Sequence, residues 1–190
     1  EIYTEHVVGS VDVYKRQGEE QEIIYSVSSD EIPLSNLRNG WSEQDPESWI
    51  VALETCLKKL QLKIDFQQIK SISFSGHMHG ATCLNEKNEI IRPCILWNDT
   101  RSHQECEEIM RDNSVKDIAG NIAMPGFTAP KVLWLKYNEP ENFKSINKVL
   151  LPKDFLRFYL TGDFYSDLSD ASGTYWLDIA KRDWLSLIHI

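Results

Sequence analysis

Two short segments of this chain carry side chains suited to binding a small polyhydroxylated molecule. The first is Met78-His79, a thioether beside an imidazole. The second is Trp97-Asn98-Asp99, which adds an indole, an amide and a carboxylate. One aromatic face with a few hydrogen-bonding groups is typical of a pocket for a sugar, and suits a lipid or a nucleic acid less well. We therefore take these five residues as candidate substrate-binding residues.

A strand and a hairpin must position the two segments. The apolar run 72–74 predicts a strand within 71–75 that ends just before the first segment. Gly76 and Gly80 permit turn geometry around that segment. We place the two strands of the following hairpin near 81–84 and 90–95, so that it delivers the second segment to the same edge of the sheet. Ligands of open α/β sheets bind at such an edge, beyond the carboxyl ends of strands.

The rest of the chain alternates between strand and helix patterns. Asp45-Pro46 is typical of a helix start, and apolar residues follow it at helical spacing. Asn98, Asp99 or Thr100 is expected to cap a helix over about 101–111. The remaining expected elements are strands at 22–27 and 149–151, a helix opening at Pro130 and a helix over 153–160. This alternation predicts an α/β domain.

Several candidate residues have a second interpretation that the pattern leaves open. His79 is either a ligand for a sugar hydroxyl or a structural histidine in a turn. Asp99 is either a sugar contact or a helix cap, and Trp97 is either a pocket wall or ordinary core. His77 and His79 have the spacing of a metal-binding pair, but no third ligand follows at a recognisable spacing, so we reject a metal site.

Composition narrows the classes of function. The chain has 190 residues, enough for one domain or one domain with part of a second, and 42% of them are hydrophobic. A formal net charge of −9 argues against a nucleic-acid or anionic-membrane partner. No apolar run approaches the roughly 18 residues of a membrane span. The four cysteines show no close pairing, which favours reduced thiols in a cytoplasmic protein.

An ordered series of motifs resembles the FGGY family of carbohydrate kinases. The two longest are SGHMHGAT at 75–82 and RPCILWNDTR at 92–101. The likeness is strongest to the members that act on D-xylulose, although His77 stands where those members usually carry Gln. Shorter matching blocks follow the family's order at 41–46, 124–131, 151–154, 169–174 and 176–178.

The resemblance implies a fold and an activity. The fold is an incomplete ribonuclease-H-like (actin-like ATPase) N-terminal lobe. The activity, with ATP and Mg²⁺, is transfer of the γ-phosphoryl group to the 5-hydroxyl of D-xylulose in D-xylose catabolism. Met78 and His79 would contact the sugar, and the intact enzyme could form a homodimer. The alternatives are another FGGY kinase acting on a ketose, polyol or gluconate, or a non-catalytic sugar-binding fragment.

The same resemblance places the phosphoryl-transfer groups outside this chain. The family's glycine-rich phosphate hairpin, with its Asp-x-Gly-Thr element, does not occur in the sequence. The general-base aspartate and the adenosine pocket are expected downstream of Trp184. We therefore assign no catalytic and no cofactor-binding residue to the chain, and we expect no turnover from the 190 residues alone.

Both ends of the chain resemble translated sequencing adaptor. The end sequence of transposase-based DNA libraries encodes 185–190 in one orientation, and its reverse complement encodes 12–17. We expect 1–17 and 185–190 to be adaptor-derived and 18–184 to be the partial N-terminal kinase domain. The other interpretation is a natural N-terminal strand and an apolar C-terminal tail.

Overall fold

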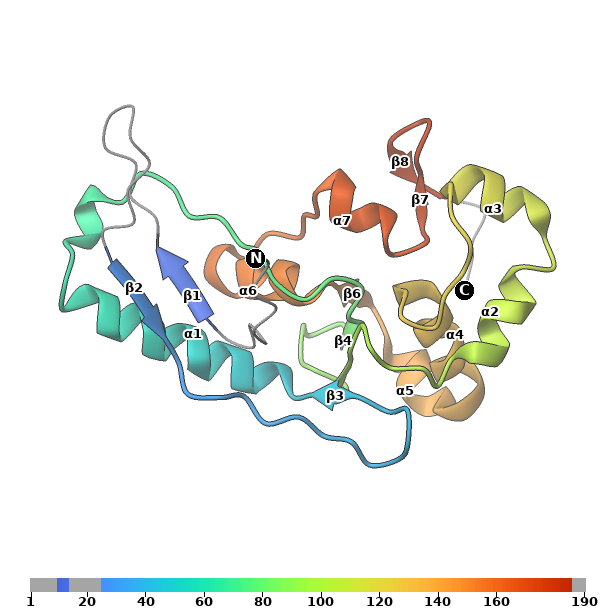
Figure 1. Cartoon of the computed structure of the whole chain (residues 1–190), viewed down its shortest axis with the longest axis horizontal. Helices are drawn as coiled ribbons and strands as arrows, with labels where there is room; N and C mark the ends of the chain where they lie inside the picture. The colour runs from blue at the N-terminus through green and yellow to red at the C-terminus, as the bar shows by residue number, and fades with distance from the viewer. Residues whose placement is uncertain (1–9, 14–24, 186–190) are drawn as a thin grey trace, which may run out of the picture. The chain divides into compact units, whose positions relative to one another are not determined.

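The computed structural model describes residues 10–13 and 25–185, and side chains from 25 onward. Most of the two expected adaptor segments therefore lies outside the described residues. The chain divides into two compact units, one formed by 1–33 with 47–74 and the other by 34–46 with 75–190. Figure 1 shows the elements of both units, each of which we describe by itself.

The first unit contains a two-stranded hairpin. Strand β1 (Ser10–Val13) pairs antiparallel with β2 (Tyr25–Ser28), and Ser10 lies opposite Ser28. The strand expected within 22–27 is thus present from Tyr25 in the described part of the chain. A link to the following helix comes from Lys59, whose ammonium donates a 2.7 Å hydrogen bond to the carbonyl of Ser28.

The predicted helix start at Pro46 is confirmed. Helix α1 (Pro46–Gln61) begins there because proline lacks the N–H that the first helical turn leaves unpaired. Glu47 in the first turn and Lys58 in the last turn suit the helix dipole. A short 3₁₀ helix, η1 (Phe66–Gln68), follows after the cap Asp65. The helical spacing buries one face of α1, made of Trp49, Ala52, Leu53, Cys56 and Leu60.

The strand predicted within 71–75 is wrong. Residues 71–77 form no strand, and Ile72 is 51% exposed. A strand needs a neighbour to take up its backbone hydrogen bonds, and none of the described segments pairs with this one. The apolar run therefore leads into the second unit as extended coil.

The second unit is built on short antiparallel strands. Strand β4 (Thr82–Leu84) pairs with β6 (Lys148–Leu150), and β3 (Glu43–Gln44) pairs with β5 (Cys94–Ile95). A single bridge between Ala81 and Ile95 joins the two pairs. The hairpin expected between 81–84 and 90–95 is confirmed in outline. The side chain of Asn85 closes its turn by accepting hydrogen bonds from two backbone N–H groups.

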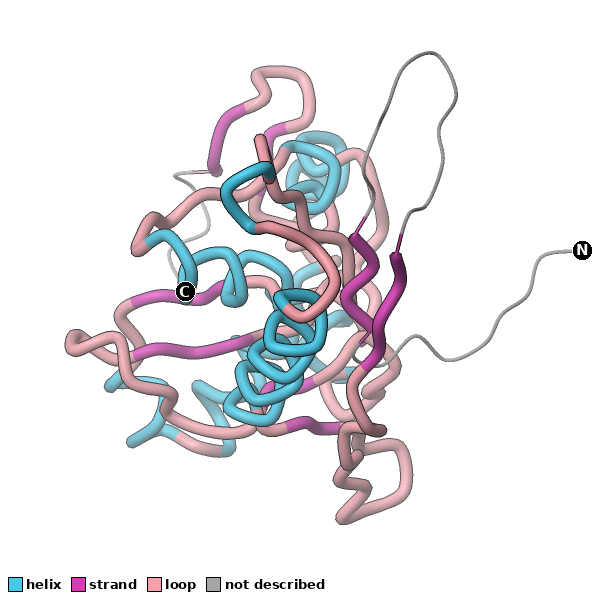
Figure 2. The backbone as a smooth tube through the Cα atoms, turned by 90° about the vertical axis from the view of Figure 1, so that its left-hand side faces the viewer, coloured by secondary structure: helices cyan, strands magenta, loops and turns pink. Residues whose placement is uncertain are grey.

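The second unit consists mostly of helices and loops, and its strands are short (Figure 2). Helix α4 (Thr128–Asn138) is buried along 128–135, and one core cluster joins its Trp134 and Leu135 to Cys83 and Ile95 of the strands. The helices are α2 (His103–Ile109), α3 (Asn113–Ala119), α4 (Thr128–Asn138), α5 (Pro140–Ser145), α6 (Pro152–Thr161) and α7 (Leu168–Ser172); strands β7 (Leu177–Asp178) and β8 (Asp183–Trp184) complete the unit.

The capping prediction for α2 is wrong. The helix begins at His103 with Ser102 at the cap, so none of Asn98, Asp99 and Thr100 caps it. The Asp99 carboxylate instead accepts from the N–H of Arg101, in a turn that precedes the helix. The helix expected to open at Pro130 begins two residues earlier, at Thr128.

All four cysteines are buried and free. Burial raises the pKa of the Cys83 thiol to about 12 and that of Cys94 to about 11, because a thiolate is disfavoured away from water. No helix of the described part of the chain is long and apolar enough to cross a membrane.

Candidate functional site

His79 lies in a left-handed backbone conformation. Its φ is 63°, a region that side-chain-bearing residues seldom occupy. Two hydrogen bonds hold its carbonyl, one from the Thr128 hydroxyl at 3.1 Å and one from the Lys131 ammonium at 2.8 Å. The next residue, Gly80, packs so closely that an added Cβ would be 2.6 Å from Cγ of Pro152. The turn is therefore fixed by α4 and by the start of α6.

The His79 ring is held on two sides. Its Nδ1 atom lies 2.9 Å from the carbonyl oxygen of Gly173, and its centroid lies 4.7 Å from that of Phe127. Partial burial lowers the pKa of His79, and the charge of Lys131 adds to that effect. The Gly173 hydrogen bond and the charge of Asp170 act in the opposite direction without reversing it. The imidazole is therefore mainly neutral at pH 7, with one donor and one acceptor nitrogen.

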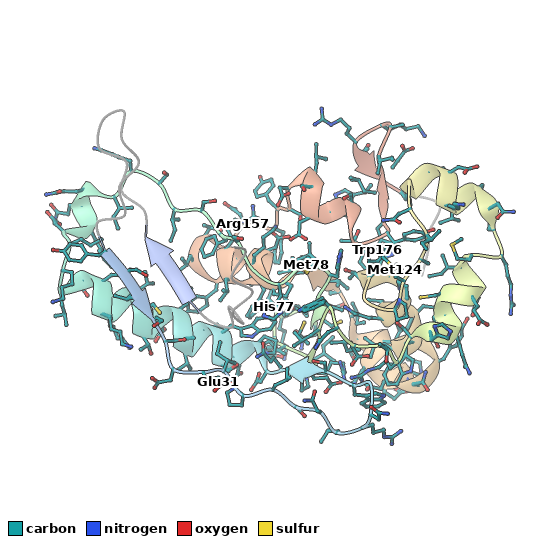
Figure 3. All side chains as sticks on the ribbon, viewed as in Figure 1. Glu31, His77, Met78, Met124, Arg157 and Trp176 are labelled. Atoms are coloured by element: carbon teal, nitrogen blue, oxygen red, sulfur yellow. The ribbon has the colours of Figure 1, made fainter. Side chains whose placement is uncertain are left out.

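Met78 and His77 precede this ring. The Met78 side chain is 44% exposed and is free to contact a ligand. His77 is half-buried, and neither of its ring nitrogens has a hydrogen-bond partner among the described residues. Burial lowers the pKa of His77. His77 and Met78 belong to the coil that precedes β4 (Figure 3). In the same coil, a Cβ added to Gly76 would lie 3.9 Å from Cβ of Lys153 in α6.

The structure brings the two predicted segments to the same end of the strands. Ala81 and Ile95 form an antiparallel bridge. Because the two strands run in opposite directions, the residues before Ala81, which include His79, and those after Ile95, which include Trp97, lie at the same end of the bridge. Trp97 is 49% exposed and Asn98 is also exposed, which leaves an indole and an amide available to a ligand. The prediction of a common edge is thus met, although the strand 71–75 that prompted it does not form.

Residues 124–131 connect the two segments. An added Cβ at Gly126 would overlap the backbone carbonyl of Trp97. The Ser102 hydroxyl donates a 3.1 Å hydrogen bond to the carbonyl of Pro125 in the same stretch. Because Thr128 and Lys131 bind the carbonyl of His79, this stretch contacts both segments. The Met124-Pro125-Gly126 turn therefore lies at the edge of the candidate site.

Asp99 points into the protein. It is 1% exposed, and its Oδ2 atom accepts a 2.6 Å hydrogen bond from the backbone N–H of Ser42. Arg101 donates to both carboxylate oxygens, with Nε 2.9 Å from Oδ1 and Nη2 2.7 Å from Oδ2. Both carboxylate oxygens therefore already accept hydrogen bonds from groups of the protein interior. Asp99 fixes the turn that presents Trp97 and Asn98.

Asp99 belongs to a buried ionic network. Glu43 of β3 pairs with Arg101, whose Nη1 lies 2.6 Å from its carboxylate, and also with Arg92. Arg92 in turn donates through Nε to Glu139 at 2.9 Å. The Arg101 guanidinium stacks 3.7 Å from the ring centroid of Trp41. This network joins β3 to the end of α4 beneath the candidate site.

Sequence reasoning assigned no role to several residues that build the site. Lys131 and Thr128 bind a carbonyl, and Gly173 binds a ring nitrogen, all across long sequence separations. The sequence offers one signal for Lys131, which is a lysine among the apolar residues of an expected helix. If that stretch is buried, the charge needs a partner. No comparable signal marked Gly173. Among the described residues, no group of three histidine, cysteine, aspartate or glutamate side chains could hold a metal ion.

A search of protein-family models gives one result that decides the family. The model of the N-terminal domain of the FGGY family of carbohydrate kinases matches residues 13–189. The chain belongs to this family.

The relatives and solved structures agree. The chain is 48% identical to xylulose kinase of Escherichia coli strain K12 over 166 residues, and 45% identical to that of Klebsiella pneumoniae over 167. Its structure matches the xyloylose kinase of Brucella ovis with a TM-score of 0.83 at 47% identity, covering 86% of this chain and 34% of that one. Gluconate kinase of Lactobacillus acidophilus matches with a TM-score of 0.79 at 28% identity, covering 86% and 33%.

The predicted fold class is confirmed by these matches, since the neighbours are FGGY sugar kinases with the ribonuclease-H-like, actin-like fold. The E. coli and K. pneumoniae relatives each match 87% of this chain, and the match covers 34% of their own length. The chain therefore spans about a third of the relatives.

Proposed function

We propose that this chain supplies the sugar-binding wall of an ATP-dependent kinase that phosphorylates D-xylulose on its 5-hydroxyl. The observation that carries the proposal is the placement of Met78, His79, Trp97 and Asn98 at one end of the strands of the second unit. The similarity to relatives named xylulose kinase supports D-xylulose as the sugar.

In this proposal each exposed side chain has a defined part. The neutral ring of His79 exchanges a hydrogen bond with a sugar hydroxyl, and the Met78 thioether packs beside it. The Trp97 indole covers an apolar face of the sugar, and the Asn98 amide binds a further hydroxyl. Asp99 acts from beneath, because its oxygens are already bonded to Ser42 and Arg101. This revises the direct sugar contact expected for Asp99.

The proposed reaction uses ATP and Mg²⁺, but we assign no residue of this chain to binding either of them. Mg²⁺ is held by carboxylates together with substrate phosphates, and the described residues contain no group of three His, Cys, Asp or Glu side chains that could hold a metal ion. The general base is proposed to lie in the part of the relatives that this chain does not cover. We propose a cytoplasmic kinase, with a homodimer as the form of the intact enzyme.

We also propose that 1–17 and 185–190 are adaptor-derived, which genomic DNA read without a transposon adaptor would test.

Binding of D-xylulose to the chain is the direct test. The chain has three methionines, so selective ¹³C-methyl labelling gives three NMR signals. Met78 and Met124 belong to the site, whereas the Met110 sulfur accepts hydrogen bonds from the Ala123 N–H and the Tyr175 hydroxyl. D-xylulose is expected to move the Met78 signal most and the Met110 signal least.

A sugar panel separates the candidate functions. Gluconate or glycerol moving the Met78 signal, with D-xylulose inert, would assign the chain to another FGGY kinase. Absence of any shift in a folded sample would contradict the sugar site altogether. To test catalysis, residues 18–184 can replace the matching segment of the E. coli enzyme. The chimera is expected to phosphorylate D-xylulose with ATP, whereas the chain alone is expected to show no turnover.

A further inference from the structure

Gly173 lies directly against the candidate sugar-binding histidine. A Cβ added to Gly173 would overlap Cε1 of the His79 ring and come within 2.5 Å of its Nδ1. The φ angle of Gly173 is −74°, which any residue can adopt, so backbone freedom does not explain a glycine here. The close approach of the ring does. Glycine is the residue that lets the imidazole reach the Gly173 carbonyl.

The contact defines which ring nitrogen carries the proton. A carbonyl oxygen only accepts hydrogen bonds, so the 2.9 Å contact from Nδ1 of His79 to Gly173 requires a proton on Nδ1. Burial keeps the ring mainly neutral by lowering the pKa of His79. A neutral ring protonated on Nδ1 has its lone pair on Nε2. The second nitrogen is therefore an acceptor.

Two further contacts fix the position of Gly173. The carbonyl of the next residue, Thr174, accepts a 2.9 Å hydrogen bond from the N–H of Ala129, at the start of α4. On the other side, the Lys153 ammonium of α6 pairs with Asp167 at 2.9 Å and with Asp170 at 3.2 Å. Lys153 thereby ties the first turn of α7 to α6. The carbonyl that meets His79 is held at both ends of its segment.

We propose that Gly173 is a positioning residue for sugar binding, which holds His79 in the Nδ1–H form so that Nε2 accepts a hydrogen bond from a sugar hydroxyl. The identity of the ligand as a sugar rests on the proposed function, whereas the tautomer of His79 does not. It assigns the polarity of one contact: the hydroxyl donates and the protein accepts. A sugar analogue that lacks the hydroxyl bound by His79 would leave Nε2 without its hydrogen-bond donor.

Nitrogen NMR of the ligand-free chain tests the tautomer without any sugar. The chain has five histidines, and ¹⁵N-histidine labelling with long-range correlation to the ring protons distinguishes a protonated nitrogen from a bare one. The His79 signals are assigned by their loss in His79→Gln. We expect Nδ1 protonated and Nε2 bare in the unaltered chain. The reverse pattern would overturn the inference and leave the sugar site itself standing.

Two variants separate positioning from general stability. Gly173→Ala is expected to displace the ring, to remove the Nδ1–H pattern of His79 and to weaken D-xylulose binding about tenfold. Ser172→Ala removes the 2.6 Å hydrogen bond from Ser172 to the Ser169 carbonyl on the same helix and is expected to keep the pattern. An unchanged pattern in Gly173→Ala would contradict the role of Gly173.

The sugar step has its own readout. Addition of D-xylulose to the unaltered chain is expected to shift the Nε2 resonance of His79 and to leave Nδ1 nearly unmoved. A confirmed tautomer whose Nε2 resonance does not respond to D-xylulose would overturn the sugar contact of His79, and the proposed function fails with it only if the Met78 methyl signal also stays unmoved. If Gly173→Ala proves unfolded by circular dichroism, the tautomer of the unaltered chain alone decides the inference.

Discussion

The Oδ2 atom of Asp99 accepts a 2.6 Å hydrogen bond from the backbone N–H of Ser42, 57 residues earlier in the chain. Both residues are buried, and the same carboxylate is bonded to Arg101. The turn that carries Trp97 and Asn98 is thus anchored from within the fold to the residue just before β3. The exposed part of the candidate site depends on a buried ionic contact directly behind it.

Asp99→Ala is expected to destabilise the chain by about 3–5 kcal/mol, because it removes one partner of a buried ion pair. Asp99→Asn should cost less, since its amide oxygen can still accept from Ser42. Urea unfolding measures both free energies. Asp117→Ala, at an exposed aspartate of α3, serves as the matched control and should stay within about 0.5 kcal/mol of the unaltered chain. An Asp99→Ala value equal to the control would show that the network contributes nothing.

Lys131 is expected to make stability depend on pH. Burial lowers the pKa of its ammonium from 10.5 to about 8. Between these two values the unfolded chain binds more protons than the folded one, so the contribution of Lys131 to the free energy of unfolding rises with pH over that interval.

Lys131→Met removes this titration. The difference in unfolding free energy between the unaltered chain and the variant should grow from pH 7.5 to 9.5, measured by urea unfolding at each pH. Taking the difference cancels the titration of the groups that do not interact with Lys131, whereas Cys94, whose pKa is raised by burial and lowered in part by the charge of Lys131, cancels only in part. A pH-independent difference would mean that Lys131 keeps an ordinary pKa in the folded chain.

Trp97→Ala is expected to weaken D-xylulose binding by about tenfold while changing stability little, because half of the indole is already in water. The affinity is read from the Met78 methyl shift. Trp184→Ala provides the matched control, since Trp184 is exposed to a similar extent, 54%, on β8. Equal affinities in the two variants would remove Trp97 from the sugar site.

Gly126→Ala should disturb the site through the backbone. The added Cβ meets the carbonyl of Trp97, which cannot move aside as a flexible side-chain end can. We expect a loss of about 1–3 kcal/mol in the free energy of unfolding, together with weaker D-xylulose binding. Thermal unfolding and the sugar titration check the two effects separately. Full stability with full affinity would show that the 124–126 turn is not fixed against Trp97.

The thiols should resist alkylation in the folded chain. All four cysteines are buried, and the pKa of Cys83 and of Cys94 is raised to about 12 and about 11, so very little thiolate forms at neutral pH. Iodoacetamide followed by mass spectrometry should modify these residues only after urea is added. Rapid labelling of Cys83 without urea would indicate that the packing around β4 opens in solution.

Sequence patterns predicted local structure well and pairing less well. Helix α1 and the hairpin closed by Asn85 follow from spacing, caps and turn residues that lie within a few positions of one another. The strand expected around Ile72 depended on a distant partner that no local pattern specifies. Its apolar residues suggested a strand, but no described segment pairs with them.

The candidate site shows the same limit at the level of single side chains. Trp97, Asn98 and Asp99 are consecutive, and the sequence analysis predicts a sugar contact for all three. The structure exposes the first two and buries the third, because Ser42 and Arg101 lie within reach of Asp99 alone. The support of His79 by Lys131 and Gly173 likewise spans 52 and 94 residues of chain. Such contacts become visible only when the fold is known.

The backbone of His79 limits how this position can change. Its φ of 63° suits glycine, asparagine, aspartate or histidine, whereas branched or bulky residues would strain the turn. Among those four, only histidine offers an imidazole to Gly173 and a second nitrogen beyond it. A mutational library at this codon should therefore separate into two groups: Asn, Asp and Gly would yield folded chains that lack sugar affinity, and β-branched residues would be lost at the level of expression.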